Sequence, residues 1–114
     1  MSKLDAAVGT YLAAMTEKLG MKTVDVDLLR KVAKSLGPSI YRADSKYVAC
    51  GDKDERARIR KNFLVKKLGL PDTDKLDGSV KEVCEQMKPL KSAKHRAVAY
   101  YLLTKKHRKS GIFA

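Results

Sequence analysis

The sequence predicts an all-α fold, a compact single-domain bundle of about five helices with a buried C-terminal helix. Three observations lead to this prediction. Apolar residues recur at helical spacing in several segments, and β-type alternation never extends beyond short runs such as "SIY" and "YVAC", which could pair briefly. The apolar run "AVAYYLL" at 97–103 surrounds a whole helix circumference, as in a helix buried on all sides. We therefore expect residues 1–114 to form a single helical domain with no separate linker.

The first two helices are predicted by apolar stripes with clear ends. In residues 2–19, apolar side chains recur four, seven and eight positions apart, and Gly20 ends this helix. The second helix begins at Asp25, which can cap its first turn, and Gly37-Pro38 stops it. The residues that this helix is expected to bury are Leu29, Val32, Ala33 and Leu36.

The third helix follows a long connection, "LGPSIYRADSKYVACGDKDE" at 36–55. Asp52 can cap its first turn, and Glu55, three residues later, can bond back to the cap residue as in a capping box. Gly69 closes this helix. Because a helix stop and a helix start explain both ends of the connection, we expect its middle, residues 39–50, to be a packed plug over the bundle rather than a catalytic loop.

The last two helices are separated by a proline. The fourth begins near Asp74 or at Ser79, which also opens a capping-box pattern. Pro89 ends the fourth helix, and Ser92 can cap the last one, which runs to about Lys109. The apolar face of the fourth helix comprises Leu76, Val80, Val83, Cys84 and Met87.

The composition describes a basic protein. The chain has 25 lysines and arginines against 13 acidic residues, and its net charge is +12. Such a charge favours anionic partners without defining a mechanism. No apolar run is long enough to span a bilayer, and the N-terminus lacks the apolar core of a secretory signal. We expect a cytoplasmic protein with no membrane contact, present as a monomer or a weak homodimer.

The placement of the cations is the strongest functional signal. Residues 56–67 contain six cations and no acid, and residues 88–109 contain eight cations and no acid. On a helical wheel, Arg56, Arg60 and Lys67 fall within about 40° of one another, between apolar flanks. Such a ridge must extend into solvent, pair with an acid from another helix, or meet an anionic partner. We predict that these three residues contact an anionic partner.

The other chemistry-bearing residues have structural explanations. No Gly-rich phosphate loop and no H-E-x-x-H or G-x-S-x-G pattern is present, and the clustered carboxylates fall at helix starts. Cys50 and Cys84 form no C-x-x-C motif and imply no disulfide framework, so we interpret both as structural cysteines. His95 and His107 are interpreted as surface residues, and their spacing from the cysteines fits no zinc site. We expect no enzymatic activity, no metal and no cofactor.

Four stretches carry a resemblance to a known family. Read together, "VAKSLGPSIYRADSKYVACGDKDE", "KNFLVKKLGL", "VCEQM" and "RAVAYYLLTK" resemble a family of short bacterial proteins known only as a conserved domain of unknown function. The similarity covers nearly the whole chain. It implies an all-helical bacterial domain that stands alone, with no assigned activity, cofactor or catalytic residue. The resemblance therefore supplies no site residues.

Two functional hypotheses follow. The first is a non-enzymatic protein-interaction module with a basic surface, which predicts one apolar surface patch rimmed by cations. The alternative is a nonspecific nucleic-acid-binding protein that uses the basic residues of the third and fifth helices, and it predicts strongly salt-dependent binding. No recognisable nucleic-acid-binding motif supports the alternative.

Overall fold

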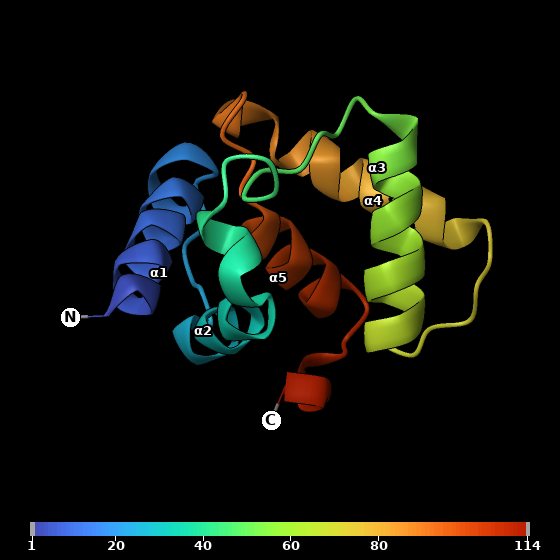
Figure 1. The fold of residues 1–114 in the computed structure, drawn as a ribbon, viewed down its shortest axis with the longest axis horizontal. Coiled ribbons are helices and arrows are strands. Elements are labelled where there is room, and N and C mark those ends of the chain that lie inside the picture. The colour runs from blue at the N-terminus through green and yellow to red at the C-terminus, as the bar shows by residue number, and fades with distance from the viewer. Residues whose placement is uncertain (1, 114) are drawn as a thin grey trace.

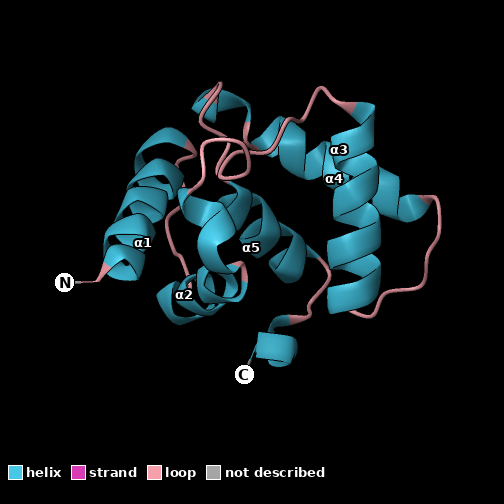
Figure 2. Cartoon of the chain, in the orientation of Figure 1, coloured by secondary structure: helices cyan, strands magenta, loops and turns pink. Residues whose placement is uncertain are grey.

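The C-terminal helix lies at the centre of the fold. In the computed structural model, which describes residues 2–113, α5 (Arg96–Lys106) runs between the first two helices of the chain on one side and the next two on the other (Figure 1). Every residue of α5 from Ala97 to Thr104 is buried. The described residues contain helices and connecting segments but no β-strand (Figure 2). These observations confirm the predicted all-α bundle with a buried C-terminal helix.

Five α-helices and several shorter helical segments make up the described chain. The other α-helices are α1 (Lys3–Ala13), α2 (Val26–Ser35), α3 (Lys53–Arg58) and α4 (Lys75–Gln86). Short 3-10 helices occupy Gly37–Tyr41, Lys88–Leu90 and Ser110–Phe113. The Cα radius of gyration of 13.0 Å is about that expected of a compact body of this length. No helix among the described residues is long and apolar enough to cross a membrane.

Two helices continue beyond their α-helical part as wider, π-helical turns. α1 continues as π-helical turns over Ala14–Lys18, and α3 does so over Ile59–Lys67. At the end of the second stretch, the backbone N–H of Leu68 donates to the carbonyl oxygen of Phe63 at 2.9 Å, a bond that reaches back five residues. Each residue of a π-helix turns through a smaller angle than in an α-helix. A helical wheel drawn at α-helical spacing therefore does not describe residues 59–67.

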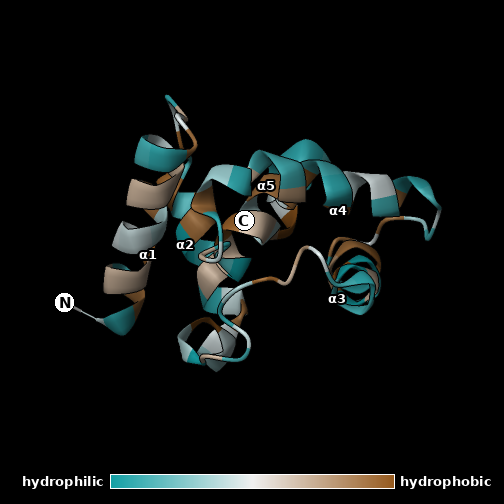
Figure 3. Ribbon diagram, turned by 90° about the horizontal axis from the view of Figure 1, so that it is seen from above, coloured by the Kyte–Doolittle hydropathy of each residue, from teal (hydrophilic) through white to brown (hydrophobic). Residues whose placement is uncertain are grey.

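Local sequence signals correctly predicted the second helix and two helix ends. The Asp25 carboxylate accepts the N–H of Leu28 at 3.1 Å and caps α2. Gly20 and Gly69 adopt φ values of +68° and +71° at the ends of the first and third helices, where a side chain would be strained. The apolar residues predicted for α2 pack inward. Figure 3 shows the same segregation on α3, whose hydrophobic and hydrophilic residues lie on opposite sides.

Two predictions for the starts of the later helices were wrong: the capping box at Asp52 and the cap at Ser92. Asp52 accepts the N–H of Asp54 at 2.8 Å, but the Glu55 carboxylate is buried against arginines and does not complete a capping box. α4 begins after Asp74, the first of the two starts considered, so Ser79 lies inside the helix. Ser92 caps nothing, because α5 begins only at Arg96. These side chains fit the local capping pattern, but tertiary contacts or the longer helix decide their roles.

The connection between α2 and α3 packs over the bundle, as expected of a plug. Its residues 46–48 pair with residues 94–96: the N–H of Val48 donates to the Lys94 carbonyl and the N–H of Arg96 donates to the Lys46 carbonyl, both at 2.8 Å. This pairing differs from the one considered between "SIY" and "YVAC". Val48 is only 4% exposed. The paired segment also explains why α5 starts late, since the His95 backbone, with φ −55° and ψ 130°, is not helical.

The two histidines are not simple surface residues, which corrects the interpretation from sequence. The His95 ring lies 5.0 Å from that of Tyr11 and 5.3 Å from that of Tyr47, between centroids. Burial, with a smaller effect of Lys46, lowers the pKa of His95. Burial also raises the pKa of Tyr11 to about 12. The Nε2 atom of His107 is buried as well. His95 is thus part of the packing that holds the plug.

Candidate anion-binding cleft beside a disulfide

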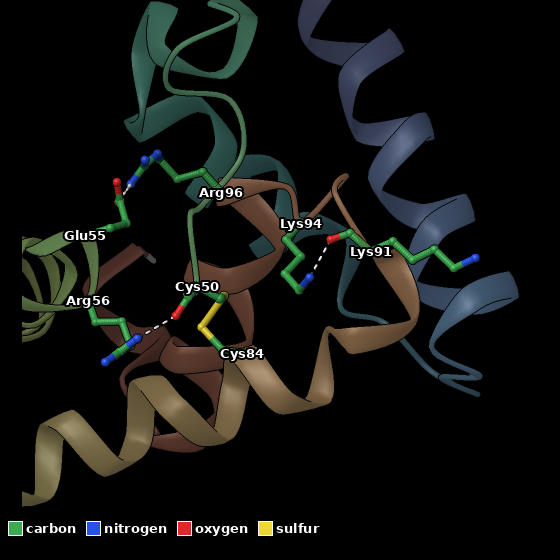
Figure 4. Close-up of a disulfide and its surroundings, with 7 residues drawn as sticks. All are labelled: Cys50, Glu55, Arg56, Cys84, Lys91, Lys94 and Arg96. Carbon is green, nitrogen blue, oxygen red and sulfur yellow. Dashed lines mark hydrogen bonds and ion pairs between the residues drawn. A yellow bond between two sulfur atoms is a disulfide. The ribbon is translucent and has the colours of Figure 1, made fainter. Parts of the chain in front are cut away.

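A disulfide joins the plug to α4. Cys50, at the end of the plug, is bonded to Cys84 of α4 across 34 positions of sequence (Figure 4). Their Cα atoms are 5.7 Å apart, an ordinary separation for a disulfide. This bond was not expected from the sequence and is a correction, whereas the interpretation of both residues as structural cysteines agrees with their packing against the core. Both residues are half-buried and pack at the edge of the core, so the bond is not sealed inside the protein.

The disulfide lies in the wall of a basic surface cleft of about 460 Å³. Four cations and one acid contribute to this cleft, and they come from α3, from α4 and from the segments that follow α4. The cleft is lined by Cys50, Gly51, Arg56, Lys81, Cys84, Glu85, Lys88 and Lys94. Positive charge thus gathers around the two sulfur atoms. We refer to this hollow as the disulfide cleft.

Arg56 has the most defined position among the four cations. Its Nη1 atom donates to the Cys50 carbonyl oxygen at 2.7 Å, which links α3 to the end of the plug (Figure 4). Its Nε atom is buried and has no hydrogen-bond partner among residues 2–113. The guanidinium is thus held at the cleft by one neutral acceptor. No carboxylate among the described residues forms an ion pair with it within 4.0 Å, so its charge remains available to an anion.

The lysines of the disulfide cleft are held more loosely. The Nζ atom of Lys81 lies 3.4 Å from Asp77 Oδ2, and the Nζ atom of Lys88 lies 3.7 Å from Glu85 Oε1. The two lysine side chains are 60% and 77% exposed, and exposed pairs of this kind contribute little stability. Lys94 donates to the Lys91 carbonyl oxygen (Figure 4). These ammonium groups can therefore turn toward a ligand at low cost.

The predicted cationic ridge is divided between different places. Arg56 and Arg60 line a second cleft between α3 and α4, which shares Arg56 and Lys81 with the disulfide cleft. The Arg60 Nε atom donates to Asp72 Oδ1 at 2.8 Å. Lys67 lies elsewhere, with its Nζ atom 5.2 Å from the centre of the Phe113 ring. The widened turns of residues 59–67 explain the separation, because they rotate Lys67 away from the line through the two arginines. Contact of these residues with an anionic partner stays a prediction.

The sequence contained part of the signal for the disulfide cleft. Lys81 and Lys88 stand three residues before and four residues after Cys84, which places all three on one face of a helix. This spacing places Cys84 at the edge of the apolar face of the helix, next to the two lysines. Lys94 had no comparable signal, because it reaches the cleft only through the path of the chain after α4.

A buried ion pair beside the cleft holds the plug in position. The Nη1 atom of Arg96, on α5, lies 3.0 Å from the Oε1 atom of Glu55, on α3. The Nε atom of Arg96 donates to the Ser45 carbonyl oxygen at 2.6 Å. Burial acts to lower the pKa of Arg96, but Tyr100 and Glu55 outweigh burial and raise it. The Glu55 and Arg96 side chains are only 11% and 13% exposed. This pair is therefore a structural connection rather than a binding site, and it fixes the plug that carries Cys50.

The fold and the cleft together define a small all-α domain with a cationic surface hollow at a disulfide. Residues 10–111 match a protein family described as "Protein of unknown function (DUF2853)". The chain belongs to this family, which confirms the resemblance to a domain of unknown function. No curated protein matches the chain.

Proposed function

We propose that this protein is a non-enzymatic interaction module that binds an acidic segment of a partner protein at the disulfide cleft. One observation supports the proposal above all: four cations and one acid line a single hollow, and Arg56 is held there by the Cys50 carbonyl group. Complementary charge steers association and orients the partner. The proposal includes a cytoplasmic location and a monomer or weak homodimer. Disulfides are rare in the cytoplasm and usually transient there, so the oxidation state of this bond in the cell must be measured together with partner binding.

Charge rather than apolar contact is the basis of recognition in this proposal. Among the described residues, the large hydrophobic side chains with high exposure are Val26, Tyr41 and Ile112. None of them lines the disulfide cleft. The apolar patch rimmed by cations that the sequence led us to expect is not found at this site. Binding should therefore be weak and should decrease with salt.

An acidic peptide fits the disulfide cleft better than a nucleic acid does. Proteins that bind single strands combine a basic groove with aromatic side chains on which bases stack. No aromatic residue lines this cleft, and Glu85 and Asp77 interrupt the positive surface beside Lys88 and Lys81. A strand that follows successive phosphates would pass these acids. A peptide with two or three carboxylates can place them at the cations only.

The proposal is tested by fluorescence anisotropy with a labelled oligoglutamate peptide, a matched oligoglutamine and a single-stranded oligonucleotide. We expect oligoglutamate to bind at about 50 mM salt and to dissociate as salt rises. The double variant Lys81→Gln/Lys88→Gln should bind it at least about five-fold more weakly. Lys18→Gln/Lys22→Gln is the matched control, because it removes the same charge from exposed positions outside the cleft.

Each alternative result has a defined meaning. Equal weakening by the two double variants would show that net charge, not the disulfide cleft, drives binding. Tighter binding of the oligonucleotide than of oligoglutamate would favour the nucleic-acid alternative. Absence of binding to either polymer at low salt would contradict both.

A further inference from the structure

We propose that the Cys50–Cys84 disulfide is a redox-exchange site for an anionic low-molecular-weight thiol of the glutathione class. The proposal goes beyond the binding of an acidic partner. It depends on the charge of the disulfide cleft but not on the existence of that partner. Two features of the structure support it: both cysteines line an open cleft, and the cleft is rich in cations.

Access to sulfur is the first requirement of thiol–disulfide exchange. A thiolate must approach one sulfur atom of the bond, and a disulfide sealed in a core does not permit this approach. Cys50 and Cys84 are half-buried, and both lie in the cleft wall. The buried core of the bundle lies behind them. The cleft is therefore a route by which a small thiol can reach the bond.

The charge of the cleft selects among small thiols. A thiol of the glutathione class carries two carboxylates and one ammonium, so its thiolate is attracted by Arg56, Lys81, Lys88 and Lys94. The same cations stabilise the cysteine thiolate that leaves when the bond opens. The acids that face this group are Glu85 and Asp77, which make exposed pairs with Lys88 and Lys81. The cations outnumber these acids, so attraction of an anionic thiolate dominates.

The exchange consists of two balanced substitutions. The thiolate of the small thiol attacks one cysteine sulfur, a mixed disulfide forms, and the second cysteine leaves with the electron pair of the broken bond. A second thiolate then attacks the small-thiol sulfur of the mixed disulfide and releases the first cysteine as a thiolate. The protein disulfide is reduced by two electrons, and two small thiols are oxidised to their disulfide. The oxidised small thiol closes the bond by the reverse route.

The test compares the opening of the disulfide by three thiols in the full chain. Reduced glutathione is anionic, 2-mercaptoethanol is neutral and cysteamine is cationic. Free protein thiols are alkylated at intervals after an acid quench and counted by mass spectrometry, and each rate is corrected for the thiolate fraction of its thiol. At low salt we expect glutathione to react about ten-fold faster than cysteamine.

Matched variants show whether the cleft causes this preference. Lys81→Gln/Lys88→Gln/Lys94→Gln should reduce the preference for glutathione several-fold, whereas Lys3→Gln/Lys18→Gln/Lys22→Gln should leave it nearly unchanged. In addition, Cys84→Ser treated with oxidised glutathione should gain the mass of one thiol adduct, and Cys50→Ser provides the same test if the first variant does not fold.

Three results would overturn the proposal. They are equal corrected rates for the three thiols, an equal loss of preference in the two triple variants, and a disulfide that millimolar glutathione does not open. None of these results affects the binding of oligoglutamate to the oxidised protein. Conversely, an oxidised protein that does not bind oligoglutamate leaves the exchange measurement intact, so the two proposals can fail separately.

Discussion

The two sides of α5 are held in different ways. On the side of α1 and α2, contact is mainly apolar, and the Tyr101 hydroxyl adds one hydrogen bond by accepting the N–H of Asp25 at 2.9 Å. On the side of α3 and α4, apolar packing is supplemented by the Glu55–Arg96 ion pair and by the disulfide. The first kind of contact depends on shape. The second depends on charge and oxidation state, and the disulfide cleft lies on this side.

The difference follows from the paths of the chain. Residues 19–25 alone separate the helical turns of the first helix from α2, whereas the connection that contains the plug runs over residues 36–52 and is helical only at Gly37–Tyr41. Ordering such segments costs conformational entropy. Directional bonds to Arg96, Arg56 and Cys84 offset this cost at defined points. The region with the candidate site is therefore also the region that can respond to solution conditions.

The largest loss of stability is expected from a cavity created on the side of α5 that faces α1 and α2. Leu29 is fully buried, and Leu29→Ala should lower the free energy of unfolding by about 4 kcal/mol. Urea unfolding should give the same loss with and without reductant, because the contact is apolar. Val26→Ala, at a residue that is 44% exposed, is the control and should cost less than about 1 kcal/mol. Similar losses in the two variants would contradict this description of the apolar side.

The second effect concerns the buried ion pair. Glu55→Ala leaves Arg96 buried without its carboxylate and should cost about 3 kcal/mol in urea unfolding. The control Glu85→Ala removes an acid whose side chain is 75% exposed and should cost less than about 1 kcal/mol. If the two variants proved equally stable, Glu55 would not be the structural connection inferred here.

The third effect concerns the disulfide, which is present on the α3 and α4 side of α5 and absent from the side of α1 and α2. Reduction of Cys50–Cys84 should lower the free energy of unfolding by about 2–4 kcal/mol, because the unfolded chain regains the freedom of the loop that the bond closes. The melting temperature should therefore fall on addition of a phosphine reductant. Cys50→Ser/Cys84→Ser should melt near the reduced protein and should not respond to the reductant. A reductant-independent melting temperature of the wild-type chain would disprove this contribution.

The smallest effect is a dependence on pH. Burial lowers the pKa of His95 below its usual value of 6.5, so the unfolded chain takes up a proton first as the pH falls. Stability should therefore decrease from about pH 7 downward and level off below the pKa of the folded state. His107, whose pKa is also lowered by burial, contributes in the same window. His95→Gln should reduce the slope in urea unfolding at several pH values, and an unchanged slope would exclude His95 as its source.

Local patterns predicted the helices well and the site only in part. The cap at Asp25 and the apolar circumference of 97–103 depend on residues within a few turns, and the structure agrees with both. Arg56 was also singled out from the sequence as a contact for an anionic partner, which stays a prediction; in the structure its neighbour at the cleft is the Cys50 carbonyl group. Lys67 was grouped with it on an α-helical wheel, and the π-helical turns made that grouping wrong.

The sequence by itself determined which segments are helical, which faces they bury and that the last helix is central, because these properties depend on the spacing of apolar residues along one element. The tertiary structure alone decided that Cys50 meets Cys84, that Glu55 turns from its cap to Arg96, and that Lys94 joins the disulfide cleft. Each of these contacts joins residues far apart in the chain. They depend on how the plug crosses the bundle, and periodicity within single helices does not encode that path.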